Sequence, residues 1–381
     1  MQHFTTLPPL SLYVHIPWCV RKCPYCDFNS HEARQEIPER EYVDALLRDL
    51  EQDLPRVWGR PVYSIFIGGG TPSLFSPESI DCLLSGVRAR LPLDQDVEIT
   101  LEANPGTVEL ERFKGFRAAG INRLSIGIQS FNEVKLKALG RIHGPSEAMR
   151  AAEAARAAGF NNFNLDLMFG LPQQSVEEAL ADIRRAIELE PSHLSVYQLT
   201  IEPNTLFHAR PPKLPDDDSI GEMQIQLQTE LAATGYWQYE VSAYAREGFE
   251  CRHNLNYWEF GDYLGIGAGA HAKITQAGGI TRLWKVKQPN EYLRTAGAPE
   301  SIGGEQPLSR QHTVTEFMMN ALRLNRGFPS RLFAERTGLP ISVAARPLLE
   351  AEQKGLITWD IETLRPTDTG FRYLNNLVAM F

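Results

Sequence analysis

The chain has 381 residues, of which 43% are hydrophobic and 22% are charged, a composition typical of a folded globular protein. Its formal net charge of −9 argues against non-specific nucleic-acid binding, which needs a basic surface. No apolar run is long enough to span a membrane, and the first residues lack the features of a signal peptide. We therefore expect a cytoplasmic protein with one large domain and a smaller one.

Apolar, β-branched segments alternate with helical segments along the first half of the chain, which is the pattern of successive βα units. Six strands are predicted, at residues 11–16, 62–67, 97–102, 123–128, 162–168 and 193–199. Helices are predicted at residues 39–54, 78–91 and 147–160, and from a capping box at Ser175 and Glu178 to Pro191.

Glycine or polar residues stand at the carboxyl end of every predicted strand. In a parallel barrel these ends share the face that carries active sites. A doubly wound sheet also fits the alternation, but this one-sided distribution favours an α/β fold built as a partial (β/α)6 barrel with an open side.

Past residue 272 the sequence changes character. Residues 273–312 are rich in turn formers and are predicted to be a connector. Three predicted helices follow, at 313–324, 330–338 and 346–357, and then a short hairpin and a terminal helix. This is the outline of a winged helix, but its third helix is not basic, so we expect a packing module and no nucleic-acid partner. The predicted domains are a barrel (1–272), the connector (273–312) and a mainly α, winged-helix-like domain (313–381).

Three of the five cysteines, Cys19, Cys23 and Cys26, are spaced C-x3-C-x2-C after the first strand. A reducing compartment disfavours disulfides, so the triplet predicts a metal site. A closed zinc site needs a fourth ligand, which His15 or His31 could supply. An iron–sulfur cubane held by three thiolates instead leaves one iron open, and the position on the predicted catalytic face favours this cluster. Cys82 falls inside a predicted helix and is expected to be buried.

This cysteine motif resembles that of the radical S-adenosylmethionine superfamily. The segments "GGGTPSLF", "EANPGT", "RLSIGIQSF", "ALGRIH" and "NLDLMFGLP" extend the resemblance to the branch of oxygen-independent coproporphyrinogen oxidase. It implies a [4Fe-4S] cluster on the three cysteines, with S-adenosylmethionine on the open iron. The residues that it places around S-adenosylmethionine are Tyr13, Tyr25, Gly69, Gly70, Thr71, Glu102, Gln129, Arg141 and Asp166. Among these, Glu102 and Asp166 would bind ribose hydroxyls and Arg141 a carboxylate.

Two features separate the sequence from the oxidases that it resembles. Phe28 stands where they have a further cysteine, and the first strand begins at about residue 11, without their N-terminal extension. The segment "HNLNYW", beginning at His253, matches instead the H-N-x-x-Y-W motif of the haem chaperones in this branch, the HemW type. In that reading His253 binds haem, Cys251 is an alternative ligand, and His271 could also face the cofactor.

The resemblance therefore implies a chaperone that takes haem as cargo and delivers it to haem proteins, such as respiratory enzymes. Further expectations are an electron donor such as flavodoxin, a homodimer and transient contact with a membrane. No catalytic residue is assigned. The alternative is an oxygen-independent coproporphyrinogen III oxidase, which forms protoporphyrinogen IX by radical decarboxylation.

Overall fold

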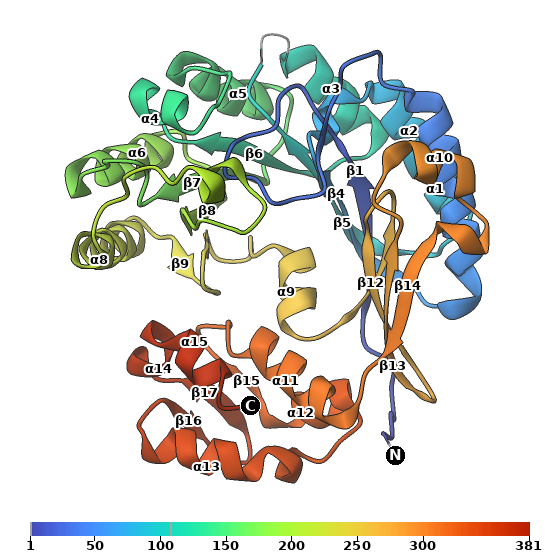
Figure 1. Cartoon of the computed structure of the whole chain (residues 1–381), viewed down its shortest axis with the longest axis vertical. Coiled ribbons are helices and arrows are strands. Elements are labelled where there is room, and N and C mark those ends of the chain that lie inside the picture. The colour runs from blue at the N-terminus through green and yellow to red at the C-terminus, as the bar shows by residue number, and fades with distance from the viewer. Residues whose placement is uncertain (1, 107–108) are drawn as a thin grey trace.

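The large domain is built on one long mixed sheet (Figure 1). The structure is a computed structural model, which describes residues 2–106 and 109–381. Six parallel strands form the centre of the sheet in chain order, and each pairs with the next. They are β1 (Leu10–Ile16), β4 (Val62–Gly69), β5 (Leu93–Ala103), β6 (Arg123–Gln129), β7 (Phe163–Phe169) and β8 (His193–Gln198). All six predicted strands are confirmed.

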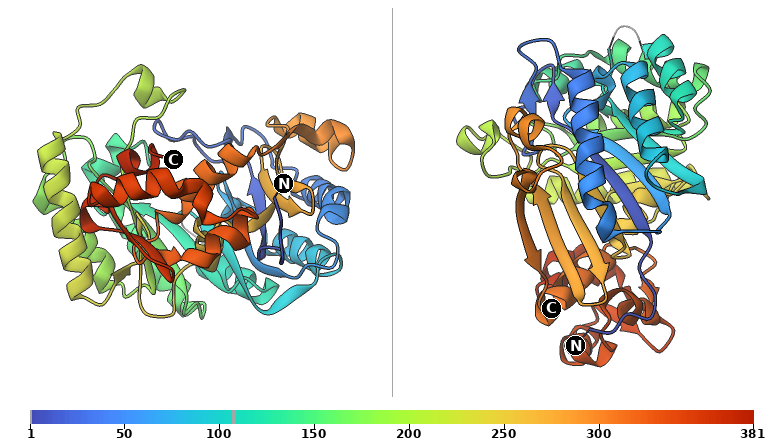
Figure 2. Two further views of the ribbon diagram at one scale, coloured as in Figure 1. Left: turned by 90° about the horizontal axis from the view of Figure 1, so that it is seen from below. Right: turned by 90° about the vertical axis from the view of Figure 1, so that its right-hand side faces the viewer.

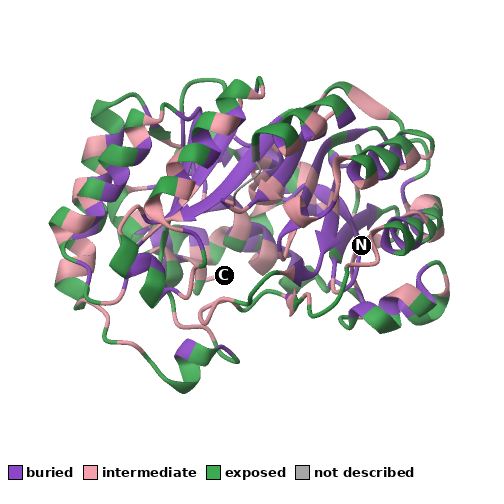
Figure 3. Cartoon of the chain, turned by 90° about the horizontal axis from the view of Figure 1, so that it is seen from above, coloured by how far each residue is buried: buried purple, intermediate pink, exposed green. Residues whose placement is uncertain are grey.

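Helices surround this sheet and turn their exposed faces away from the buried strands (Figure 3). They are α1 (Glu39–Asp53), α2 (Pro77–Arg88), α3 (Glu109–Ala119), α4 (Glu133–Ala138), α5 (Pro145–Ala157), α6 (Val176–Glu188), α7 (Leu206–Ala209) and α8 (Asp217–Ala233). The predicted capping box opens α6, because Ser175 and Glu178 each accept from the other's backbone N–H. Cys82 lies in α2 as predicted, but it is exposed, so its predicted burial is wrong. The buried face of α2 consists of Ile80, Leu83, Leu84 and Val87, and Cys82 lies on the other face.

The two edges of the parallel strands are extended differently. β1 pairs along its free edge with β11 (Asp262–Ile266), which runs parallel to it although it comes much later in the chain. At the opposite edge, β10 (Ala243–Ala245) and β9 (Trp237–Gln238) are antiparallel. Within the described residues the strand order has two free ends, so the barrel is partial, as predicted.

The segment 273–312 is not the predicted loop-rich connector, and that prediction is wrong. It contains most of β12 (His271–Gln276), all of β13 (Gly279–Lys285) and β14 (Ile302–Pro307), and the helix α10 (Pro289–Thr295). These antiparallel strands continue the sheet beyond β11. Buried polar residues of these strands have partners on other strands, as in the ion pair of Lys273 with Asp262 on β11, and Gly304 leaves room for the ring of Trp284. Because polar and glycine residues occupy these strand positions, the sequence of segment 273–312 has the composition of a loop.

The C-terminal region has a hydrophobic core of its own around Phe317, Phe328 and Phe333. Its helices are α11 (Arg310–Ala321), α12 (Ser330–Thr337), α13 (Ala345–Gln353), α14 (Asp368–Arg372) and α15 (Leu374–Val378). A small sheet has the order β15 (Phe328–Pro329), β17 (Thr363–Pro366) and β16 (Ile357–Trp359), which gives the predicted winged-helix-like outline.

The N-terminal segment runs alongside this region (Figure 2). The backbone N–H of His3 donates to the carbonyl oxygen of Gly338 over 2.9 Å, and Gln2 donates to Thr313 over 3.0 Å. Among the helices of the described chain, none combines the length and apolarity that crossing a bilayer requires.

Candidate cofactor site

The three cysteines lie on a loop that is held by a short parallel pair of strands. β2 (Trp18–Cys19) pairs with β3 (His31–Glu32), and the loop between them carries Cys23 and Cys26. All three thiols are free and partly exposed. Among the described residues, no three His, Cys, Asp or Glu side chains converge on one point as a single-ion site requires.

The zinc alternative also lacks a free histidine at position 15. The Nδ1 of His15 lies 2.9 Å from the hydroxyl of Tyr13, and its Nε2 lies 2.8 Å from the carbonyl oxygen of Asn29. Both ring nitrogens are therefore engaged in holding the strand and the cysteine loop together.

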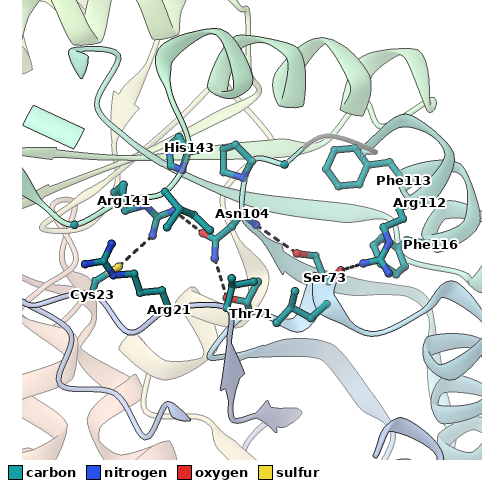
Figure 4. A pocket seen from close by; sticks show the side chains of 16 residues that line it. Arg21, Cys23, Thr71, Ser73, Asn104, Arg112, Phe113, Phe116, Arg141 and His143 are labelled. Carbon is teal, nitrogen blue, oxygen red and sulfur yellow. Dashed lines mark hydrogen bonds between the residues drawn. The ribbon is translucent and has the colours of Figure 1, made fainter. Parts of the chain in front are cut away.

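Arg141 is directed at the cysteine loop by two fixed acceptors (Figure 4). Its Nη2 donates to Asn104 Oδ1 over 2.6 Å and to the carbonyl oxygen of Gly127 over 2.7 Å, and its Nη1 donates to Cys23 Sγ over 3.7 Å. Asn104 also donates to the hydroxyl of Thr71 over 2.9 Å. These residues lie around a cavity of 400 Å³. Sequence reasoning missed Asn104, although it is a polar residue directly after β5 in the "EANPGT" segment, whose Thr107 lies outside the described residues.

The glycine segment after β4 fastens the cysteine loop to the sheet. The backbone N–H of Gly70 donates to Ile16 and that of Thr71 to Trp18, both over 2.7 Å. A Cβ at Gly70 would lie 2.5 Å from the Trp18 carbonyl oxygen, so only glycine allows this approach. These N–H groups already donate to backbone carbonyl oxygens. The carbonyl oxygens of the segment are therefore the backbone groups that could accept from the amino group of a ligand.

Two carboxyl side chains lie on the same face. Glu102 accepts from the backbone N–H of Gly69 over 3.1 Å, and burial, together with the nearby Asp166, raises its pKa to about 8. Asp166 accepts from Ser125 over 3.0 Å and from Asn164 over 2.8 Å, and burial raises its pKa as well. Both side chains are thus fixed acceptors for hydroxyl groups.

Gln129 is the clearest sign that this face is built for a ligand. It ends β6 with a φ of 68°, a conformation that a residue with a side chain rarely adopts. Its Oε1 is buried and has no hydrogen-bond partner among the described residues. Strained backbone and an unpaired buried acceptor are typical of binding sites.

Of the two predicted tyrosines, Tyr13 lines a cavity and Tyr25 packs on an aromatic neighbour. Tyr13 lines a second cavity of 360 Å³ together with Gly69 and Glu102. The ring of Tyr25, within the cysteine loop, packs against Phe207 with ring centroids 6.3 Å apart.

His253 does not line either cavity. It lies in α9 (Arg252–Trp258), only 2% exposed, with its Nδ1 3.0 Å from the hydroxyl of Ser64 and its backbone N–H donating to Glu98 over 3.2 Å. Burial and the nearby Arg123 lower its pKa to about 3, so the ring is neutral. Its Nε2 is buried and has no hydrogen-bond partner among the described residues.

Cys251, the alternative ligand, is also buried. Its thiol donates to Glu98 over 3.5 Å, and burial raises its pKa to about 12. It is therefore a protonated thiol, and its environment is that of a structural residue.

The chain matches the family model of the Radical SAM superfamily over residues 13–186 and that of the HemN C-terminal domain over residues 308–373. It is 54% identical over 376 residues to the heme chaperone HemW of Escherichia coli K12, covering 98% of each chain. It is 35% identical to the heme chaperone HemW of Bacillus subtilis 168, covering 91% of this chain and 92% of that one.

A solved structure has the same fold at lower identity. Coproporphyrinogen III oxidase (HemN) from Escherichia coli, described as a radical SAM enzyme, matches with a TM-score of 0.82 at 26% identity, covering 98% of this chain and 90% of that one. The full-length similarity to the HemW proteins is the higher of the two. The chain therefore belongs to the radical S-adenosylmethionine superfamily and, within it, to the HemW family.

Proposed function

We propose that this protein is a cytoplasmic haem chaperone that holds a [4Fe-4S] cluster and S-adenosylmethionine and delivers haem to haem proteins. The observation that carries the proposal is the 54% identity over the full chain to a heme chaperone, against 26% to the oxidase. Phe28 supports the same choice, because an exposed aromatic side chain stands where the oxidases that the sequence resembles have a cysteine.

The residues present fit the cofactors of the superfamily. Cys19, Cys23 and Cys26 would hold three irons of the cluster, which leaves the fourth iron for the amino and carboxylate groups of S-adenosylmethionine. When bound, the reduced cluster supplies one electron to the sulfonium of S-adenosylmethionine. The unpaired Oε1 of Gln129 supports a ligand at this face.

The chain itself positions and shields these groups. Arg141 is held by Asn104 and Gly127 before any ligand arrives, so little side-chain freedom is lost when it pairs with a carboxylate. Glu102 and Asp166 would accept from the ribose hydroxyls, and Thr71 and Gly70 keep the cysteine loop against the strand ends. Tyr13 would contact S-adenosylmethionine from the cavity wall that it shares with Glu102.

The recipient of haem is proposed only as a class, haem proteins such as respiratory enzymes. An electron donor such as flavodoxin, a homodimer and transient membrane contact stay predictions. Coordination of haem by His253 also stays a prediction, and it requires a conformation in which the buried ring becomes accessible.

Anaerobic haem titration of the cluster-reconstituted protein tests the proposal. We expect a saturable change in the Soret band and transfer of the bound haem to an added apo-haem protein. In a parallel reaction with coproporphyrinogen III, S-adenosylmethionine and a chemical reductant, we expect no protoporphyrinogen IX. Robust turnover would favour the oxidase alternative, and the absence of saturable haem binding would overturn the chaperone.

A further inference from the structure

We propose that His193 is a positioning residue for S-adenosylmethionine binding: through the side-chain amide of Asn164 it fixes the carboxylate of Asp166, which accepts from the ribose. This inference rests on the proposed function, in which S-adenosylmethionine is a cofactor, and it deepens that function by naming residues that act behind the ligand contacts. The three side chains come from two neighbouring parallel strands, β7 and β8 (Figure 1).

Asp166 is the member of this group that a ligand can reach. It is half-buried, whereas Asn164 is 2% exposed and His193 is 0% exposed. Residues 164 and 166 share one face of β7, because side chains alternate along a strand. The register pairs Asn164 with His193, so the amide and the ring lie one layer farther than the carboxylate from the carboxyl ends of the strands.

Both oxygens of Asp166 are held by donors on buried side chains. Oδ1 accepts from Asn164 over 2.8 Å, and Oδ2 accepts from the hydroxyl of Ser125 over 3.0 Å. The Asn164 amide also donates to Ser125 over 2.8 Å, so the three groups form a closed set of hydrogen bonds. Each carboxylate oxygen can accept more than one hydrogen bond, so acceptors remain for the hydroxyls of a ligand.

The orientation of the Asn164 amide decides whether it supports or repels this carboxylate. A side-chain amide has a donor end and an acceptor end, and turning it over would place Oδ1 against Asp166. His193 opposes this, because its Nδ1 lies 2.7 Å from Asn164 Oδ1. The hydroxyl of Ser195 donates to the same oxygen over 3.1 Å. The acceptor end is thereby held toward β8 and the amide nitrogen toward Asp166.

His193 can donate at Nδ1 because its other ring nitrogen faces a donor. Burial lowers the pKa of His193 well below its ordinary value, so the ring is neutral and carries a single N–H. Nε2 lies 2.8 Å from the hydroxyl of Tyr239, and that hydroxyl accepts from the backbone N–H of Cys251 over 3.3 Å. The donors therefore point one way along a relay whose members, in order, are Cys251, Tyr239, His193, Asn164 and Asp166.

Buried polar side chains can also serve the fold alone, so the effect on the ligand has to be separated from any effect on stability. A double-mutant cycle does this. H193L keeps an apolar side chain at the position but no hydrogen bond, and H193N restores a side-chain N–H near the place of Nδ1. Each is made in the wild-type background and together with D166A. Anaerobic calorimetry on the cluster-reconstituted proteins measures the affinity for S-adenosylmethionine.

A second pair of variants, Y239F and Y236F, compares two buried tyrosines of one segment. Y239F removes the hydroxyl that donates to His193. Tyr236 is the matched control, because its hydroxyl donates to the carbonyl oxygen of Pro191 over 2.6 Å and lies outside the relay. Circular dichroism melts establish which variants are folded. If H193L does not fold, Y239F in the two backgrounds decides the question.

We expect H193L to bind S-adenosylmethionine about tenfold more weakly than wild type and Y239F about threefold, while H193N and Y236F stay within about twofold. In the D166A background, where the carboxylate is gone, H193L and Y239F should cause no further loss. Wild-type affinity in H193L, or an equal loss in both backgrounds, would overturn this inference alone and leave the proposed function standing. A wild type that binds no S-adenosylmethionine would overturn the cofactor part of the proposed function and this inference with it.

Discussion

The Nδ1 of His253 lies 3.0 Å from the hydroxyl oxygen of Ser64, a residue 189 positions earlier in the chain. Ser64 belongs to β4, and its hydroxyl also lies 2.8 Å from that of Ser11 on β1. The backbone N–H of His253 donates to Glu98 on β5. Three neighbouring strands thus hold α9, so His253 contributes to the fold whatever its part in haem binding.

H253A should therefore destabilise the protein by about 2 kcal/mol, because it opens a buried cavity and leaves Ser64 with one partner fewer. S64A should cost about 1 kcal/mol, since it removes the hydrogen bond with little loss of volume. Denaturant unfolding followed by circular dichroism measures both. An unchanged unfolding midpoint in H253A would show that the burial of this ring adds nothing to stability. In that case, a loss of haem binding in H253A could not be attributed to misfolding.

The low pKa of His253 predicts acid destabilisation. Burial lowers this pKa to about 3, whereas the unfolded chain has the ordinary value of 6.5. Between these two values the unfolded state binds a proton that the folded state does not, so stability falls as the pH falls. At pH 5 this difference in proton binding lowers the free energy of unfolding by about 2 kcal/mol.

The comparison is between wild type and H253Q, with unfolding free energies measured from pH 7.5 to 5. Other buried histidines, such as His193, have lowered pKa values in both proteins, so only the difference between the curves reports on His253. Parallel curves would contradict the prediction.

S-adenosylmethionine binding should depend on the ionisation of Glu102. Its pKa of about 8 means that the carboxyl is mostly protonated at pH 7, and hydroxyl donors favour the carboxylate. Binding should tighten up to about tenfold between pH 7 and 9, in addition to any effect of the ligand's own amino group. Anaerobic calorimetry on E102Q supplies the control, because its amide cannot ionise. Identical pH profiles would remove Glu102 from the binding step.

Reactivity with a thiol reagent should separate three classes of cysteine: the buried Cys251, the exposed Cys82 and the three cysteines of the loop. Cys251 is 1% exposed and its pKa is raised to about 12, so it should not react with a thiol reagent in the folded protein. Cluster-free protein should therefore show four reactive thiols of the five in the sequence, and cluster-loaded protein only Cys82, which is exposed. Reaction of the unfolded chain gives the full count. A single reactive thiol before reconstitution would contradict the placement of the cysteine loop.

Asp262 should be among the most sensitive positions in the core. Its carboxylate lies 2.8 Å from Lys273 and 2.9 Å from Arg60, and all three side chains are largely buried. D262N should cost about 3–5 kcal/mol, since it leaves the buried ammonium of Lys273 without its counter-charge. Thermal unfolding of D262N and of the double variant D262N/K273M tests this. The double variant should recover part of the loss, and no recovery would mean that the cost has another origin.

The parallel strands and the cysteine site could be predicted because their signals are local. Each strand of the barrel is a short apolar run followed by polar or glycine residues, and Cys19, Cys23 and Cys26 lie within eight consecutive residues. The burial of His253 could not be predicted, because it depends on Ser64 and Glu98, which are distant in the sequence. Asn104 was missed for the same reason, since its link to Arg141 spans 37 positions.

The antiparallel strands β12 to β14 were missed because their side chains are stabilised by partners elsewhere. Lys273 is 1% exposed, and its ion pair with Asp262 compensates for the burial of its charge. Periodicity assumes that buried positions are apolar, whereas in this part of the sheet Lys273, Thr275 and Lys285 are buried as well.

The pairing of β1 with β11 has a consequence for biosynthesis. A ribosome adds roughly 5–20 residues per second, so β1 and the cysteine loop emerge tens of seconds before β11 is made at Asp262. Through that interval one edge of β1 is unpaired, and Asn29 lacks the carbonyl groups of Ala268 and Lys287 that later fasten the loop. The nascent chain thus displays three unprotected thiols on an unfastened loop. We expect cofactor insertion to be a post-translational step that acts on the completed chain. The three thiols are therefore open to oxidation by oxygen while the chain is being synthesised.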